Sequence, residues 1–408
     1  MTFISTQIAR VRRMPRELFL FGIAVFAIGI GSNIFESTFN NFLDERFMIT
    51  PFQRSFLEFP RELPGFLVAF VSAALSFLCS RRLSAVTMLL SVAGVLLMGF
   101  AAPSYAVMTL WLFLYSLGQH LFIPISSTIG MELSREGQTG RRLGQLNAVT
   151  NAAKITGGML VVLGFRYLHF KFEHTFVIAA VVFAIASVTF FSMKRVKPQP
   201  AKAFLKLHKK YRLYYALITI SGARKQLFIT FAPWVLVTVF NQPTQVVASL
   251  LLIGGVIGIL FQPILGNAID RFGERFVLTS EAVILILVCF GYGFSKTLFP
   301  EKIAFLIVCG CYLIDQMIFS VGMARATYMK KIATQPDHVQ STLTTGVTID
   351  HIFSISAAIL GGAIWNAWGF QYVFMFGAIL ATINIFVASR VRIPIGTTGP
   401  IATTKTGQ

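Results

Sequence analysis

The sequence predicts an all-α polytopic membrane protein whose twelve transmembrane helices form two six-helix halves. Hydrophobic residues make up 55% of the 408 residues and charged residues only 12%, about half the charged fraction of a soluble domain. Apolar runs of about 20 residues, the length that crosses a bilayer as a helix, recur along the whole chain. One basic connector leaves six such runs on either side of it.

The apolar runs define the predicted spans in chain order. The first run follows the basic residues of "RVRRMPREL", an order that secretory signals share. No small-x-small cleavage site follows, so we interpret it as the first span. The twelve spans are 18–42, 64–80, 83–101, 105–130, 144–165, 174–193, 214–240, 244–268, 276–295, 301–328, 341–367 and 370–390.

The distribution of lysine and arginine predicts the orientation. With the N-terminus inside, the inside loops and termini hold 24 of the 35 basic residues, the outside loops hold 7, and four lie within spans. Basic residues concentrate in cytoplasmic loops, so this bias explains the net charge of +19 without a nucleic-acid partner. We expect a multi-pass protein of the cytoplasmic membrane, surrounded by lipids, with both termini cytoplasmic.

The connector "MKRVKPQPAKAFLKLHKKYRLYY" predicts the domain organisation. We expect an N-terminal six-helix bundle over 1–194, a cytoplasmic basic linker over 195–213, a C-terminal six-helix bundle over 214–392 and a flexible cytoplasmic tail over 393–408. Two such halves suggest an internal duplication, a common plan among secondary transporters.

Several chemistries have no motif in this chain. The four cysteines lack the spacing of a metal site, which favours packing roles for them. The sequence contains no G-x-x-x-x-G-K-[ST], H-E-x-x-H or G-x-S-x-G motif, the patterns of nucleotide binding, zinc proteases and hydrolases. We therefore expect no enzyme activity, cofactor or metal, and a monomer.

The segment "GNAIDRFGER" between spans eight and nine carries the most specific motif. It resembles the cytoplasmic signature of the major facilitator superfamily, roughly G-x-x-x-D-R-x-G-R-R, except that Glu274 replaces the first of the paired basic residues. The matching positions are Gly266, Asp270, Arg271, Gly273 and Arg275. The equivalent segment of the first half, "CSRRLSAV", keeps two arginines but lacks the aspartate and the glycines. The resemblance implies the major facilitator fold and secondary transport by alternating access.

The signature also implies roles for individual residues. Gly266 and Gly273 permit a tight turn and a close approach of helices. Asp270 can cap the following helix or pair with an arginine, which would latch one conformation. Arg325, near the inner end of span ten, is interpreted as a cytoplasmic gate or a partner for Asp270. Asp350, in span eleven, is interpreted as a packing and gating residue.

Polar residues inside spans are costly and usually face a cavity, which the resemblance implies is lined by spans one, four, seven and ten. For each of them, a structural ion pair or a helix–helix hydrogen bond is the alternative role. Lys154, in span five, either contacts the substrate or tethers the two halves. The other substrate-binding candidates are Asn33, Glu36, Asn40, Gln119, His120, Arg224, Asp315 and Gln316.

Two substrate classes stay open. Arg224 and Lys154 favour an anionic or zwitterionic metabolite, because a desolvated guanidinium group pairs well with a carboxylate or phosphate. Glu36 and the aromatic-rich spans instead suit proton-driven export of amphipathic or cationic compounds. Protons are the expected coupling ion in both cases, with Glu36 or Asp315 as the carrier, since a buried carboxylate that loses its cation favours the protonated form.

The charge bias generates a topology prediction. Reporter fusions at Gln408 and within the 195–212 connector should both score as cytoplasmic. An outside signal from either fusion would contradict the twelve-span topology.

Overall fold

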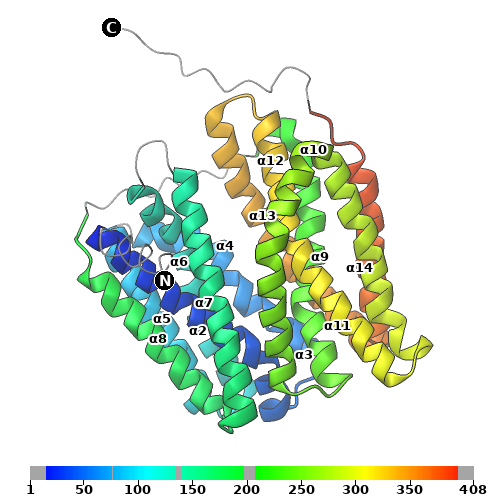
Figure 1. Cartoon of the computed structure of the whole chain (residues 1–408), viewed down its shortest axis with the longest axis horizontal. Helices are drawn as coiled ribbons and strands as arrows, with labels where there is room; N and C mark the ends of the chain where they lie inside the picture. Colours follow the sequence, from blue (N-terminus) through cyan, green and yellow to red (C-terminus); the bar gives the residue numbers. More distant parts are fainter. Residues whose placement is uncertain (1–14, 76, 135–138, 197–206, 394–408) are drawn as a thin grey trace, which may run out of the picture. The chain divides into compact units, whose positions relative to one another are not determined.

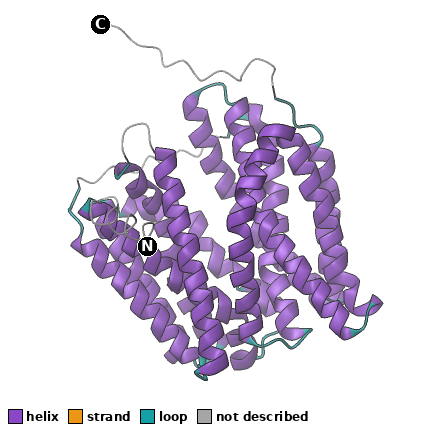
Figure 2. Ribbon diagram, in the orientation of Figure 1, coloured by secondary structure: helices purple, strands orange, loops and turns teal. Residues whose placement is uncertain are grey.

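The computed structural model describes residues 15–75, 77–134, 139–196 and 207–393. These residues form helices joined by short loops and contain no strand (Figures 1 and 2). Each of the twelve predicted spans overlaps a helix, and the predicted all-α class is confirmed. Part of the predicted linker and nearly all of the predicted tail lie outside the described residues.

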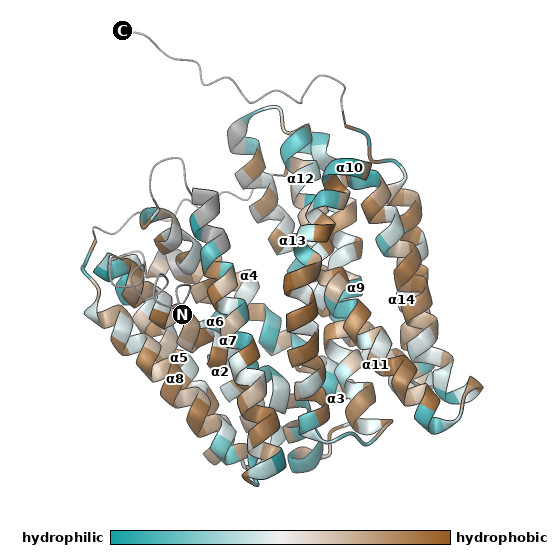
Figure 3. Cartoon of the chain, viewed as in Figure 1, coloured by the Kyte–Doolittle hydropathy of each residue, from teal (hydrophilic) through white to brown (hydrophobic). Residues whose placement is uncertain are grey.

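Nine of the described helices are long and apolar enough to cross a membrane. Figure 3 shows hydrophobic residues along most of α14, Phe370–Ala388. Two helices on predicted spans fall outside this group. One is α4, which has 17 residues, and the other is α9, whose Arg224 and Lys225 lower its hydropathy. Both carry charged residues that matter for the candidate sites.

The chain divides into two compact units. Unit 1 comprises the described residues of Met1–Ala203 together with Ile229–Ile259, so it includes the end of α9 and the start of α10. Its helices are α2 (Arg16–Phe47), α3 (Pro51–Phe56), α4 (Glu58–Ala74), α5 (Ser80–Phe100), α6 (Tyr105–Glu132), α7 (Thr139–Tyr167) and α8 (Phe172–Ser192). Within it, α2 packs against α7 and α8, α5 against α6 and α8, and α4 against α6.

Unit 2 comprises Phe204–Phe228 and the described residues of Leu260–Gln408. Its elements are η1 (Lys209–Tyr211), most of α9 (Arg212–Thr238) and of α10 (Thr244–Leu298), α11 (Glu301–Ile318), η2 (Phe319–Val321), α12 (Gly322–Ile332), α13 (Pro336–Trp368) and α14. Gly369 separates α13 from α14 with a φ of 106°.

The signature segment lies inside α10, which covers predicted spans eight and nine. The helix is interrupted only at Gly273, whose φ of 81° and ψ of 163° are not helical. A side chain would strain this backbone, so the position where the helix is interrupted favours glycine. A Cβ built on Gly266 or on Gly273 would meet no neighbouring helix or side chain of the described residues within 4 Å. The expected close approach of helices at these glycines is therefore absent within the described structure.

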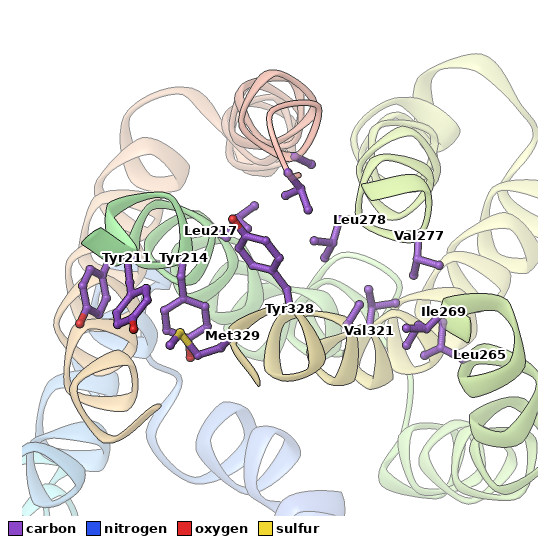
Figure 4. Close-up of a cluster of buried hydrophobic side chains, with 14 residues drawn as sticks. Tyr211, Tyr214, Leu217, Leu265, Ile269, Val277, Leu278, Val321, Tyr328 and Met329 are labelled. Atoms are coloured by element: carbon purple, nitrogen blue, oxygen red, sulfur yellow. The ribbon is translucent and has the colours of Figure 1, made fainter. Parts of the chain in front are cut away.

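An apolar cluster holds the two arms of α10 in place. Leu265 and Ile269 precede the break at Gly273, and Val277 and Leu278 follow it. All four are buried with residues of α9 and α12 (Figure 4). Close packing of these side chains stabilises the cluster. The bend at Gly273 therefore decides which residues of the signature face the cluster and which face away from it.

Predicted span ten is not one continuous helix. After Asp315 the α-helix continues only to Ile318, the turn Phe319–Val321 is a 3₁₀-helix, and α12 begins at Gly322. A 3₁₀ turn inside a long helix often marks a hinge.

Gly94 allows α5 and α6 to pack closely in unit 1. A Cβ at this position would lie 2.5 Å from the backbone nitrogen and 2.7 Å from the Cα of Tyr115. Neither atom can move without shifting α6, so the absence of a side chain is a packing requirement.

Gly94→Ala should therefore lower the thermal unfolding temperature of the purified protein, because overpacking a helix contact costs about 1–3 kcal/mol. Gly310→Ala on α11 is the matched control, since nothing lies within 4 Å of its added Cβ. Equal unfolding temperatures for the two variants would contradict the close α5–α6 contact.

Candidate functional site

Arg224, on α9, is the centre of a buried charge network in unit 2. Its Nη1 lies 3.0 Å from Oδ1 of Asp315 on α11, and its Nη2 lies 3.7 Å from Oε1 of Glu281 on α10. These three side chains are at most 3% exposed. The guanidinium group also lies over the rings of Phe228 and Phe319, where cation–π attraction adds to the pairing. The structure thus pairs Arg224 with Asp315, the neutralising contact that the sequence offers as the alternative to a role in substrate binding.

Glu281 links a second arginine to this network. Its Oε2 accepts a hydrogen bond of 2.8 Å from Nη1 of Arg325 on α12. The order of contacts is Asp315, Arg224, Glu281, Arg325, with two positive and two negative charges. The sequence pattern does not single out Glu281, although an acid within the apolar run "VLTSEAVILILVCF" is as unusual as Asp315.

The balance of charge is what makes this network stable. Removing an ion from water costs several kcal/mol even after relaxation, and only close, well-paired opposite charges offset that cost. Breaking one link leaves an uncompensated charge inside the protein unless a proton or a ligand charge replaces it. The network can therefore change its contacts only together with a change in bound charge.

The predicted pairing of Arg325 with Asp270 is wrong. Arg325 contacts Glu281, whereas the side chain of Asp270 is exposed. The reason is the rotation of α10, because its neighbour Ile269 occupies the buried position and is 3% exposed. A gating role for Arg325 stays a prediction.

Asp350, on α13, forms an ion pair with Lys225 on α9. Four residues further along α13, Ser354 Oγ donates a 3.1 Å hydrogen bond to the carbonyl oxygen of Gly222. A Cβ at Gly222 would lie 2.7 Å from Oδ1 of Asp350. These contacts bring the backbones of α9 and α13 close together, while the gating role of Asp350 stays a prediction.

Glu274, the departure from the signature, is fully buried, whereas Arg271 and Arg275 are exposed. Its Oε1 lies 2.6 Å from Nζ of Lys331, at the end of α12. The unusual acid therefore has a basic partner within unit 2.

Unit 1 has an ion pair between the corresponding two helices, but the acid and the basic residue have exchanged helices. Arg81, at the start of α5, contacts Glu132 at the end of α6. In unit 1 the basic residue thus lies on the third span and the acid on the fourth. In unit 2 the acid, Glu274, lies on the ninth span and the basic residue, Lys331, on the tenth.

A second charge cluster lies in unit 1, around the start of α4. Arg54 on α3 donates from Nε to Oδ1 of Asn40 at 2.8 Å and from Nη1 to Oε1 of Glu58 at 2.7 Å. The side chains of Arg54 and Glu58 are 1% and 0% exposed. The sequence places Arg54 in an outside loop. No local sequence pattern indicates that α3 packs the Arg54 side chain against the other helices of unit 1.

Arg61, on α4, is the cation next to Glu36 of α2. Its Nη2 lies 3.4 Å from Oε1 of Glu36, and its Nη1 lies 3.4 Å from Oε1 of Glu58. The Arg61 side chain is 16% exposed and that of Glu36 is 46% exposed. The sequence shows no cation for Glu36, because α4 begins at Glu58, six residues before the predicted span. This difference moves Arg61 from a loop onto a helix.

His120, on α6, is close to the same cluster. Its Nε2 lies 4.0 Å from Oε2 of Glu62, and its Nδ1 lies 2.9 Å from Oγ of Ser116. The hydroxyl of Ser116 also donates to the backbone carbonyl of Arg61. These contacts fix α4 against α6 and place His120 beside α4.

Gln119 connects three helices of unit 1 through hydrogen bonds. It accepts from Ser32 Oγ on α2 and donates to Ser91 Oγ on α5, both at 2.9 Å. Asn33, the neighbour of Ser32, is buried and accepts from Ser37 at 3.3 Å. Gln119 therefore has a structural role, whatever it also binds.

Two remaining candidates join neither cluster in the described contacts. Lys154 is exposed on α7, so the structure leaves open whether it contacts substrate or tethers the halves. Gln316 is partly buried on α11, next to Asp315. Two of the predicted substrate-binding residues thus lie in the network of unit 2, and three lie in or beside the charge cluster of unit 1. The first two are Arg224 and Asp315, and the other three are Glu36, Asn40 and His120.

Comparison with known sequences gives two findings. A sequence model of the Major Facilitator Superfamily matches residues 21–349. An uncharacterized MFS-type transporter of Methanocaldococcus jannaschii is 23% identical over 256 residues, which are 60% of this chain. The match spans 62% of that relative's length.

Solved structures share the fold at low sequence identity. A crystal structure of the nucleoside transporter NupG has a TM-score of 0.72 at 14% identity, covering 92% of this chain and 98% of its own. A D-xylose-proton symporter has a TM-score of 0.71 at 14% identity, covering 94% and 99%. An auto-inhibited POT family peptide transporter has a TM-score of 0.74 at 11% identity, covering 93% and 98%.

Glu281→Gln should destabilise the protein strongly, because Arg224 and Arg325 would share a single acid. Breaking a buried pair typically costs about 3–5 kcal/mol, which thermal unfolding of the purified protein would register. Glu301→Gln, at the exposed start of α11, is the control.

Adding Arg325→Met to Glu281→Gln should restore part of the lost stability, since the network is neutral again. If the double variant unfolds at a lower temperature than Glu281→Gln alone, charge balance is not what stabilises this site.

Proposed function

Because the chain belongs to the major facilitator superfamily, we propose that this secondary transporter moves a small anionic or zwitterionic solute by alternating access, coupled to protons. The proposal places it in the cytoplasmic membrane as a monomer with both termini inside. The observation that carries it is the neutral, buried network around Arg224. Uphill transport without ATP requires an ion site whose affinity differs between two conformations.

The two acids of the network are held differently, and this difference selects the proton carrier. Among the ion pairs of the described residues, Asp315 contacts one cation, Arg224, whereas Glu281 contacts both Arg224 and Arg325. If Arg224 turns away from Asp315, Glu281 remains paired. Asp315 then lies in a low-dielectric site without its cation, where binding a proton is the least costly compensation.

Glu36 is the second carrier that the sequence suggests. Its side chain is 46% exposed and lies beside Arg61, whereas the Asp315 side chain is 3% exposed. We therefore assign proton binding to Asp315 and place Glu36 among the groups that meet the solute.

Export of lipophilic cations is the second candidate function. Its support is the charge of the unit 1 cluster, in which Glu36, Glu58 and Glu62 outnumber Arg54 and Arg61. An excess of acid favours a positively charged compound.

Reconstituted protein with a pH-sensitive dye inside the vesicles would test both functions. The probes are the twenty amino acids, short mono- and dicarboxylates, and tetraphenylphosphonium. We expect one of the amino acids or carboxylates to move protons in the wild-type protein. Proton movement with tetraphenylphosphonium alone would instead support cation export.

The variants Asp315→Asn and Glu36→Gln then test the carrier. Asp315→Asn should retain exchange of the solute but lose accumulation driven by a pH gradient, by tenfold or more, because it cannot take up a proton. Glu36→Gln should change solute affinity and keep the coupling, and Glu301→Gln should change neither. Accumulation by Asp315→Asn at the wild-type level would place the coupling site elsewhere.

A further inference from the structure

We propose that Arg61 and Glu36 form a subsite for a solute that carries a carboxylate and an ammonium group on one carbon, as an α-amino acid does. Arg61 would bind the carboxylate and Glu36 the ammonium group. The proposal deepens the transport function and rests on it, but binding itself can be measured without transport.

Arg61 has unused hydrogen-bonding capacity. A guanidinium group offers five N–H donors. Within the described residues, the contacts of Arg61 with Glu36 and Glu58 are both 3.4 Å long, beyond the usual range of about 2.7–3.2 Å. One of these acids, Glu58, already has a 2.7 Å contact with Arg54. The Arg61 side chain is also 16% exposed, and a ligand carboxylate that reaches its guanidinium group could form the shorter, bidentate contacts that arginine favours.

Glu36 is the exposed residue within a stretch of its helix, residues 27–43, that is otherwise buried or partly buried. The adjacent residues Phe35 and Ser37 are each 1% exposed, whereas the Glu36 side chain is 46% exposed. Its contact with Arg61 is long, which leaves acceptor positions on both carboxylate oxygens. An ammonium group, a donor with three hydrogens, fits this acceptor.

The separation of the two groups selects the kind of zwitterion. Nη2 of Arg61 and Oε1 of Glu36 are 3.4 Å apart, so a solute that bridges them must hold its own opposite charges close together. An α-amino acid does this, whereas an ω-amino acid separates its charges by several bonds. A zwitterion also leaves the local charge unchanged, while a simple anion or cation would leave one protein group unpaired at a cost.

The surrounding charges favour the ammonium group in particular. The cluster holds three acids (Glu36, Glu58 and Glu62) and two arginines, with His120 4.0 Å from Glu62. With His120 neutral the cluster is negative by one charge, which disfavours a lone anion. Arg224, which suggests an anion from the sequence, is 3% exposed and bound to two acids, so Arg61, at 16%, is the more exposed of these two arginines.

Thermal shift and direct binding to the purified full-length protein test this subsite. The probes are the twenty α-amino acids and, for each one that stabilises the protein, its decarboxylated amine and its deaminated acid. We expect at least one amino acid to raise the unfolding temperature, and both single-charge counterparts to bind at least about tenfold more weakly, as loss of one charged hydrogen bond implies.

Arg61→Gln and Glu36→Gln should each weaken binding of that amino acid by about tenfold or more. Glu45→Gln, an exposed acid on the same helix as Glu36, should bind like the wild type. Unfolding temperatures without ligand show whether each variant is folded, and Arg61→Lys serves as a second, milder variant if Arg61→Gln is not. Lysine keeps the charge but loses the fork of donors, so weaker binding is expected there too.

The outcomes separate the subsite from the proposed function. If no α-amino acid binds, or if the amine or the acid binds equally well, the subsite is wrong even when another solute is transported with protons. If amino acids bind and Glu36→Gln abolishes binding, the subsite stands even when no solute moves protons, and the transport proposal fails instead.

Discussion

The sharing of Arg224 between Asp315 and Glu281 is the interaction on which unit 2 depends. A guanidinium group inside an apolar helix bundle cannot be neutralised by losing its proton, so acids from other helices must surround it. Asp315 comes from α11 and Glu281 from α10. Because Glu281 also contacts Arg325 on α12, one set of four charges ties together four helical segments. Their positions are coupled, and a change at any link alters the charge balance of all.

Unit 1 satisfies its polar groups in a different way. At its centre Gln119 joins three helices through neutral hydrogen bonds with Ser32 and Ser91, which tolerate rearrangement without changing charge. Its charged groups cluster around α4, where Arg54 and Glu58 are buried and Arg61 and Glu36 are partly exposed. The accessible cluster is therefore suited to meeting a solute, and the closed network of unit 2 to responding through a change of protonation.

Breaks in the backbone lie beside these charges. The 3₁₀ turn at Phe319–Val321 follows Asp315 by one helical turn and precedes Arg325. Gly273 interrupts α10 two turns before Glu281. At each break the helix on one side carries a charged residue of the network. The helix on the other side can change direction at the break without losing its own helical hydrogen bonds.

The lengths of the apolar runs, the distribution of basic residues and one signature motif predicted most of the fold from the sequence. They could do so because a helix in a membrane must form its backbone hydrogen bonds within itself. That local requirement makes each span recognisable without its neighbours, and the cost of charge in a membrane marked Asp315 and Arg224 as unusual. The turn at Gly273 was implied by the resemblance to the signature. The sequence suggested Arg224 as a partner for Asp315, but the remaining partners of those charges were decided only by tertiary structure. Glu281 lies some sixty residues from Arg224, and Arg54 and Arg61 have the local sequence of a loop. Which side chains meet depends on helix rotation and on where α4 begins, as the contact of Arg325 with Glu281 and the exposure of Asp270 show.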